Sequence, residues 1–202
     1  MNLAPTILAP TIVAIDGLDG SGKSRLAAAL ADALTAAGHP AAVLHVDDFR
    51  RPLDFEGLDP PAETALYYDS YFDFAALGEA VRQQAGAAAP GAVTIVEGVM
   101  VLRAPLPPGT WLLVLEVSPD EARGRIQARD QARGRSPQEV QRRIDRRYFP
   151  AQARYRRESD PAARAHMLVD NQDWRHPRLV RQSRELPPVL AGALAAVLGA
   201  VA

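Results

Sequence analysis

Residues 11–37, TIVAIDGLDGSGKSRLAAALADALTAA, decide the fold. Residues 11–15 are apolar and rich in β-branched side chains, which is typical of a buried parallel strand. Residues 24–37 are rich in alanine and are followed by Gly38, which favours a helix that ends there. The loop between them, residues 17–24, fits the pattern G-x-x-x-x-G-K-[ST] in the strand–loop–helix context that this pattern requires. We therefore predict a phosphate-binding loop at residues 17–24.

The side chains of this loop predict how a nucleoside triphosphate is held. Glycines let consecutive backbone N–H groups turn toward phosphate oxygens, and the positive end of the following helix points to the same place. Lys23 adds a mobile positive charge, and the hydroxyl of Ser24 can bind a magnesium ion that bridges the outer phosphates. The predicted nucleotide contacts from this segment are Gly17, Asp19, Gly20, Ser21, Gly22, Lys23, Ser24 and Arg25.

The composition supports the assignment of Lys23. Lysine and arginine together number 23, and Lys23 is the only lysine among them. A glycine-rich turn that binds nothing is the alternative, but the pattern arises by chance in a chain of this length on the order of 1% of the time or less.

The rest of the chain repeats the alternation of strand and helix. Apolar runs too short for a typical helix occur at residues 41–46, 93–96, 111–117 and 166–169. Helical stretches lie between them at about 74–84 and after the two Ser-Pro-x-Glu openings at Ser118 and Ser136, where serine can cap and proline fits the first turn. This order predicts an α/β fold with a parallel sheet of about five strands flanked by helices.

Two further segments carry predictions of their own. Residues 50–65 are rich in proline, glycine and acids and are predicted to form the longest irregular stretch, which in compact domains is often functional. The helix that opens at Ser136 carries one apolar stripe, with arginines on much of its remaining surface. The stripe comprises Val140, Ile144, Tyr148, Ala151 and Tyr155.

Length and composition limit the class of protein. The 202 residues are 48% hydrophobic and 23% charged, which suits a single domain over residues 1–202 that folds by burial alone. The chain has no cysteine, which excludes a disulfide scaffold, a cysteine-bound metal and a thiol nucleophile. Residues 1–10 carry no charge and so do not resemble a secretory signal. The apolar residues 186–202 are shorter than the roughly 20 that a bilayer requires, which favours a docking helix. We expect a cytoplasmic protein without a membrane partner.

Other classes of phosphate-loop protein fit poorly. A GTPase of the usual kind needs Asn-Lys-x-Asp to read guanine, but no second lysine exists in the chain. The Leu-Ser-Gly-Gly-Gln signature of transport ATPases is also absent, and 202 residues leave little room for the additional domains of a motor. A compact kinase remains the leading interpretation.

Acidic residues follow two of the predicted strands. Asp47 comes directly after residues 41–46 and is a candidate general base, because a carboxylate can orient an acceptor hydroxyl and take its proton. Glu97 ends the strand at 93–96 and is a candidate magnesium ligand, directly or through water. The alternative interpretation is a helix cap or a solvated loop acid for Asp47, and a cap for Glu97.

Arginines gather in the second half of the chain. Residues 121–164 hold 13 arginines and 6 acids. Arg125, Arg129 and Arg133 recur every four residues and so share one helix face. Such a face can stabilise charge on a migrating phosphoryl group, and Gly134 can let residues 122–137 move as a lid. A solvated basic face or a nucleic-acid patch is the alternative.

The ordered set of motifs resembles the uridine kinase and phosphoribulokinase superfamily of P-loop kinases, especially its uridine-kinase-like branch, across nearly the whole chain. The matching segments are residues 17–24, Asp47-Asp48-Phe49, Tyr67-Tyr68-Asp69, Glu97-Gly98, Arg125 to Asp130, and Asp170-Asn171. The resemblance implies the fold of P-loop nucleotide hydrolases, ATP and Mg²⁺ as cofactors, and a small-molecule acceptor with a hydroxyl group.

The resemblance also implies roles for single residues. Asp47 is the expected base and a neighbour of magnesium together with Ser24 and Glu97, and Lys23, Arg125 and Arg129 are expected to be catalytic. Arg133 is expected to bind the nucleotide. Acceptor contacts are expected from Asp47, Phe49, Tyr68, Asp69 and Glu97, with Asp69 on ribose hydroxyls.

The acceptor itself stays open. Relatives often read Asp-x-Phe-Tyr after the second strand, whereas this chain has Arg50 in place of that tyrosine, and Ser70-Tyr71 follows Asp69 where relatives that take uridine commonly have His-Pro. Pantothenate, nicotinamide riboside and a sugar phosphate are alternative acceptors. The aromatic residues at 67–74 can stack on a base or only pack in the core. We expect a monomer or homodimer that does not act on nucleic acid, with a nucleotide-dependent nucleic-acid-binding protein as the alternative.

Overall fold

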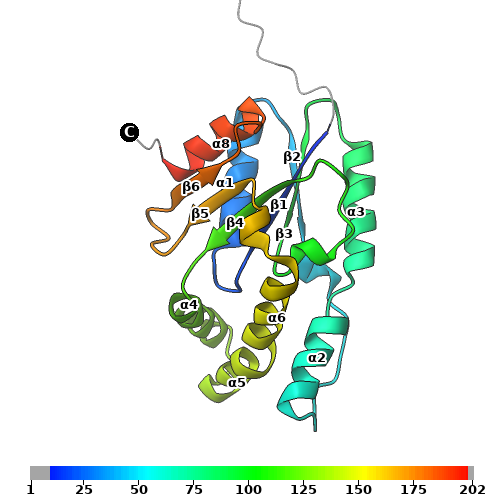
Figure 1. Ribbon diagram of the computed structural model, residues 1–202, viewed down its shortest axis with the longest axis vertical. Coiled ribbons are helices and arrows are strands. Elements are labelled where there is room, and N and C mark those ends of the chain that lie inside the picture. The colour runs from blue at the N-terminus through cyan, green and yellow to red at the C-terminus, as the bar shows by residue number, and fades with distance from the viewer. Residues whose placement is uncertain (1–9, 200–202) are drawn as a thin grey trace, which may run out of the picture.

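Strand β1 (Thr11–Gly17) lies inside a six-stranded sheet of order β2-β3-β1-β4-β5-β6 in the computed structural model, which describes residues 10–199 (Figure 1). The other parallel strands are β2 (Ala41–His45), β3 (Val93–Glu97), β4 (Trp111–Glu116) and β5 (Met167–Asp170). β6 (Arg178–Gln182) runs antiparallel to β5 at the edge. The predicted α/β fold is confirmed, but the estimate of about five strands missed β6, because this largely exposed strand reads RLVRQ and has no apolar run.

Helices cover both faces of this sheet. The larger ones are α1 (Lys23–Ala36), α2 (Pro60–Ser70), α3 (Phe74–Ala87), α4 (Pro119–Ala132), α6 (Phe149–Ser159) and α8 (Pro188–Leu198). The shorter turns are η1 (Val46–Phe49), η2 (Val101–Arg103), α5 (Pro137–Arg143), η3 (Ile144–Tyr148) and α7 (Pro161–Arg164).

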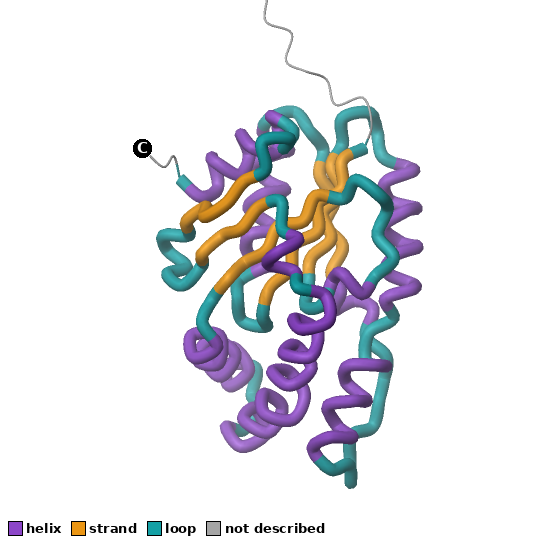
Figure 2. Tube along the Cα trace, viewed as in Figure 1, coloured by secondary structure: helices purple, strands orange, loops and turns teal. Residues whose placement is uncertain are grey.

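Figure 2 shows helices on both faces of the sheet. Buried apolar side chains form one core layer on each face. On one face, Leu30 and Leu34 of α1 pack with Leu190 and Leu194 of α8. The predicted docking helix near the C-terminus is therefore confirmed for residues 188–198. On the other face, α3 and α6 bury apolar side chains against the sheet. The prediction about a signal sequence concerns residues 1–10, of which residues 1–9 lie outside the described range. Within residues 10–199, none of the helices has the length and apolar character needed to cross a membrane.

The stretch predicted as irregular is partly helical. Residues 51–59 form a loop, but α2 begins at Pro60, so the last six residues of the predicted 50–65 stretch belong to a helix. The Asp59 side chain caps this helix by accepting a hydrogen bond from the Ala62 amide at 2.8 Å, and Pro60 fits its first turn. Two prolines near the start of a helix thus resembled a loop in the sequence.

The apolar stripe from Val140 to Tyr155 runs over three consecutive helical segments, because a π-helical turn, η3, separates α5 from α6. Pro150 has no amide hydrogen and therefore cannot bond the carbonyl of Arg146 four residues earlier. The hydroxyl of Thr64 on α2 donates to that carbonyl at 2.6 Å instead. A hydrogen bond between helices thus replaces the one that proline removes.

Candidate active site

The carboxyl ends of the parallel strands meet at one edge of the sheet, which is where open α/β sheets bind ligands. Figure 1 shows α2, α4, α5 and α6 grouped beyond this edge. β1 leads into the loop at residues 17–24, β2 leads into η1 with Asp47, and β3 ends at Glu97. The topology therefore brings the predicted phosphate loop and both predicted carboxylates to the same end of the molecule.

The phosphate loop has the backbone that its glycines predict. Gly20 and Gly22 have φ values of 79° and 94°, a region that side chains disfavour. A Cβ atom at Gly22 would lie 2.7 Å from Nδ2 of Asn171, and one at Gly20 would lie 2.6 Å from the carbonyl oxygen of Ala122. No side chain caps α1, so the amides of its first turn remain available to an anion.

Lys23 is held within this loop. Its side chain is buried, and its ammonium group donates to the carbonyl of Leu18 at 2.7 Å. The hydroxyl of Ser21 is also buried and has no hydrogen-bond partner among the described residues. The side chain of Asn171, which follows β5, donates to the Ser21 carbonyl at 2.6 Å and fixes the loop from the other side. A cation and a buried hydroxyl are thus held beside open amides.

Glu97 contacts Ser24 of α1 and His45 of β2. Its Oε1 accepts from the Ser24 hydroxyl at 2.9 Å and lies 2.6 Å from Nδ1 of His45. A hydroxyl and a carboxylate at this separation form a set of hard oxygen donors, which is what Mg²⁺ prefers. Among residues 10–199, no three acidic or histidine side chains cluster to hold an ion by themselves. The donors fit a magnesium ion that takes its remaining ligands from phosphates and water.

Asp47 lies in the first turn of η1. Although its surface is largely accessible, the surrounding protein displaces water and raises the pKa of its carboxyl, with repulsion from Asp19 and Glu97 adding to this effect. Arg50 and Lys23 act in the opposite direction. A carboxylate whose proton affinity is raised in this way is suited to accept a proton from an alcohol.

Arg129 connects α4 to the phosphate loop. Its guanidinium donates to both carboxylate oxygens of Asp19, at 2.7 and 3.2 Å, and to Oδ1 of Asp130 at 2.7 Å. Burial disfavours charge on these groups, but the ion pair outweighs it, so the pKa of Asp19 is lowered and that of Arg129 is raised. The predicted lid therefore contacts the predicted nucleotide loop directly.

A small cleft of about 80 Å³ lies between the loop and these helices. Its acidic lining residues are Asp19 and Asp47, and its aromatic ones include Tyr67, Tyr71 and Tyr148. Five arginines line it as well: Arg50, Arg129, Arg133, Arg135 and Arg143. The cleft therefore has a marked excess of positive charge, which suits a phosphorylated ligand.

Arg125 lies outside this cleft, although it shares a helix face with Arg129. It pairs with Glu121 at 2.8 Å and donates to the carbonyls of Asn171 and Gln172, each at 2.9 Å. It thus joins α4 to the chain after β5, beside the phosphate loop. Arg25 stacks over the ring of Trp174 in the same segment, 4.3 Å from the ring centroid.

Three predicted acceptor contacts, Phe49, Tyr68 and Asp69, are not among the residues that line the cleft. Tyr68 is buried with its hydroxyl on Glu158 of α6, and Asp69 lies 3.4 Å from Arg154 on the same helix. Phe49 packs at the edge of the core, and its carbonyl accepts from the amide of Asp73 at 2.8 Å. The acceptor roles of these three residues stay predictions.

Sequence reasoning missed several residues of the site. Tyr67 and Tyr71 line the cleft and stack on each other with ring centroids 4.9 Å apart, while Phe74 packs in the core. Stacking of this cluster on a base stays a prediction. His45, which carries no sequence signal of a role, lies with its Nδ1 2.6 Å from Oε1 of Glu97. Trp174, 41% exposed, is a large exposed side chain beside the loop. The dense aromatic spacing at residues 67–74 indicated Tyr67 and Tyr71 as candidates, but it could not show which aromatic side chains line the cleft.

No protein-family model matches the chain, and no curated protein matches its sequence. Solved structures do match. A candidate uridine kinase from Bacillus stearothermophilus superposes with a TM-score of 0.59 at 21% identity, over 79% of this chain and 88% of that one. A candidate fructose transport system kinase from Silicibacter sp. TM1040 gives 0.53 at 27% identity, over 77% and 88%. The chain therefore has the fold of the P-loop kinases, and its predicted resemblance to the uridine-kinase-like ones is confirmed at the level of the fold.

Proposed function

We propose that the protein is a kinase that transfers the γ-phosphoryl group of Mg-ATP to a hydroxyl of a small nucleoside-like acceptor. The observation that carries this proposal is the convergence of the phosphate loop, Asp47 and Arg129 on one cleft. Each comes from a different element at the carboxyl edge of the sheet, and each has a side chain suited to one part of phosphoryl transfer.

The side chains divide the work as follows. Lys23 and the open amides of α1 hold the outer phosphates, and Trp174 with Arg25 offers a stacking surface for the nucleotide base. Asp47 orients the acceptor hydroxyl and takes its proton. Arg129 and Arg133 stabilise the negative charge that develops on the transferred oxygens.

Ser24, Glu97 and Asp47 are the residues that would hold a magnesium ion. When bound, the ion would neutralise part of the negative charge of the outer phosphates. His45 has a supporting role, because its ring fixes the orientation of the Glu97 carboxylate.

The acceptor class is supported by two features of the cleft. Tyr67 and Tyr71 line the cleft and offer aromatic surface for a base or sugar. The excess of arginines favours an acceptor that carries an anionic group, so a sugar phosphate or pantothenate is the second candidate. A fructose transport system kinase among the structural neighbours adds weight to a sugar acceptor.

The test is acceptor-stimulated ADP release from Mg-ATP. Purified protein is assayed with uridine, cytidine, nicotinamide riboside, pantothenate and sugar phosphates, and the product is identified by mass spectrometry. A gain of one phosphate on one acceptor supports the proposal. Absence of ADP release with every acceptor, together with salt-sensitive binding of RNA or DNA, would replace it with the nucleic-acid-binding alternative.

We further propose that the protein acts in the cytoplasm as a monomer or homodimer, with no nucleic-acid or membrane partner. Light scattering at several protein concentrations distinguishes the two assembly states. A fluorescent fusion tests the compartment.

A further inference from the structure

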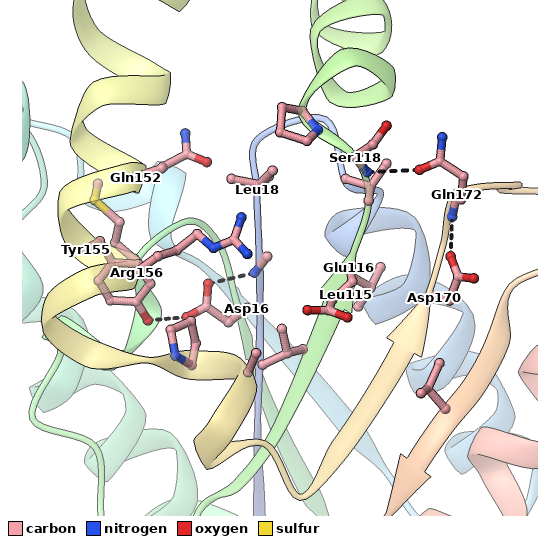
Figure 3. A pocket seen from close by; sticks show the side chains of 18 residues that line it. Asp16, Leu18, Leu115, Glu116, Ser118, Gln152, Tyr155, Arg156, Asp170 and Gln172 are labelled. Carbon is pink, nitrogen blue, oxygen red and sulfur yellow. Dashed lines mark hydrogen bonds between the residues drawn. The ribbon is translucent and has the colours of Figure 1, made fainter.

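A second cavity, of about 410 Å³, lies between the carboxyl ends of β1, β4 and β5 and the helices α6 and α7 (Figure 3). It shares no lining residue with the cleft that holds Asp47 and Arg129. Its size is within the range of sites for small organic ligands. Of the residues predicted to bind the nucleotide, only Gly17 lines this cavity, and none of the side chains given a role in the proposed transfer reaction does.

Much of the cavity wall is apolar. The apolar lining residues are Val114 and Leu115 of β4, Met100 just before η2, Leu18 of the phosphate loop, Pro161 of α7 and Val180 of β6. A wall of this kind binds an apolar body by removing it from water. This wall therefore suits a molecule with a hydrocarbon or aromatic part.

Two side chains of opposite charge, Glu116 and Arg156, face each other across the cavity. Glu116 ends β4, and Arg156 extends from α6 on the other side; Figure 3 shows both side chains reaching toward the space between them. Neither side chain forms a hydrogen bond or an ion pair with any residue in the described range 10–199. Their charged atoms are therefore more than 4.0 Å apart, the limit for an ion pair. Each charge remains available to a ligand.

The other charged groups of the cavity are already engaged. Asp170 accepts from Arg178 at 2.5 Å and from the Gln172 amide at 2.9 Å. Asp16 is fully buried and accepts from the Tyr155 hydroxyl and from the Gly17 amide. The cavity therefore presents one free anion, one free cation and an apolar wall between them.

We propose that this cavity binds a small zwitterion with an apolar side chain, of the amino-acid class, whose ammonium group pairs with Glu116 and whose carboxylate pairs with Arg156. Two charges of opposite sign on one compact ligand match two opposite charges that are too far apart to neutralise each other. Gln152 adds a further donor, because it is buried in the same wall and its Nε2 has no hydrogen-bond partner among the described residues.

The cavity is built against the phosphate loop. Gly17 and Leu18 form part of its wall, and Oε1 of Gln152 accepts from the amide of Asp19 at 2.8 Å. A bound zwitterion thus contacts the residues that shape the loop, and we expect its binding to change nucleotide affinity, a coupling that acts equally in both directions. This expectation rests on the proposed function, whereas binding of the zwitterion does not.

Calorimetry with L-phenylalanine, L-leucine and L-methionine tests the site, each compared with an analogue that has one charge. For phenylalanine these analogues are 2-phenylethylamine and 3-phenylpropanoate. At least one amino acid is expected to bind at a single site, at least tenfold more tightly than either analogue. Equal binding of phenylalanine and its two analogues, or no binding of any amino acid at millimolar concentration, overturns the proposal.

Variants locate the binding. Glu116→Gln and Arg156→Met are each expected to weaken the amino acid at least tenfold, whereas Glu79→Gln, the same chemical change on the exposed surface of α3, leaves it unchanged. Arg156 is exposed, so its variant keeps the test valid even if Glu116→Gln fails to fold. Unchanged affinity in Arg156→Met overturns the site.

The same titrations with and without a non-hydrolysable Mg-ATP analogue separate the two proposals. A change in amino-acid affinity of twofold or more supports the coupling, and no change refutes it while the site stands. Complete competition shows that the cavity is part of the nucleotide site and overturns the proposal of a separate site. If the analogue does not bind at all, the proposed kinase function fails, but the amino-acid titration still decides the second site.

Discussion

The guanidinium of Arg129 in α4 donates two hydrogen bonds to the carboxylate of Asp19 in the phosphate loop, at 2.7 and 3.2 Å. The two residues are 110 positions apart in the sequence. A second carboxylate, that of Asp130, accepts from the same guanidinium at 2.7 Å. The contact holds the predicted lid against the predicted nucleotide site. In the proposed reaction, this guanidinium would stabilise the negative charge that develops during phosphoryl transfer.

Replacement of Arg129 by alanine should therefore lower kcat more than it weakens ATP binding. We expect kcat to fall about 10²- to 10³-fold, because a lost charge donor at a transition state has an effect of this size. The dissociation constant of Mg-ATP is measured separately by calorimetry. Arg157→Ala, at an exposed residue of α6, is the matched control and should behave as wild type. An unchanged rate in Arg129→Ala would remove Arg129 from the reaction.

Asp47→Asn should abolish phosphoryl transfer while Mg-ATP still binds. The amide cannot accept the proton of the hydroxyl, and loss of a general base typically lowers the rate about 10²- to 10⁴-fold. Asp48→Asn is the control, since Asp48 is its exposed neighbour in η1. Equal rates in the two variants would show that Asp47 is not the base.

The sequence predicted the parts of the site that depend on local spacing. The phosphate loop, its strand and its helix are contiguous, so one pattern specified all three. The contact between Glu97 and His45 joins residues 52 positions apart and depends on how β2 pairs with β3, which no local pattern contains.

Helix phase explains the other differences. Consecutive residues of a helix are rotated by about 100°. Tyr67 therefore faces the cleft, while Tyr68, one residue later, faces Glu158 of α6. The sequence located α2's aromatic side chains near the site but could not say which of them would line it. β6 was missed for a different reason, because the polar surface of an exposed edge strand has no apolar signal.

Glu63 should be a main support of the helical region beyond the sheet. Its carboxylate is completely buried and accepts from Arg147 and from Arg142, the latter at 3.2 Å, with Arg146 at 3.8 Å. Glu63→Ala leaves these arginines without their buried partner, and a broken buried ion pair costs about 3–5 kcal/mol of the free energy of unfolding. Urea denaturation measures this loss. The control Glu56→Ala, at an exposed loop residue, should change stability by less than about 0.5 kcal/mol.

Asp16 should make the stability of the protein depend on pH. Burial raises the pKa of its carboxyl from 3.8 to about 6, although the Tyr155 hydroxyl partly offsets this by stabilising the charged form. The folded state therefore binds a proton more tightly than the unfolded state. Its stabilising contribution is complete below about pH 4 and is lost as the pH rises through 6, a change of about 3 kcal/mol.

Asp16→Asn removes this titrating group while its amide oxygen can still accept from Tyr155. The free energy of unfolding of the wild type should therefore fall relative to that of the variant between pH 4 and pH 7, and the difference should then stay constant to pH 8. Urea denaturation of both proteins at each pH measures it. Other groups titrate equally in the two proteins and so cancel in the comparison. If the two curves of unfolding free energy against pH are parallel over this range, Asp16 keeps an ordinary pKa. Water, or a change in the cavity wall, then relieves the burial of its carboxyl.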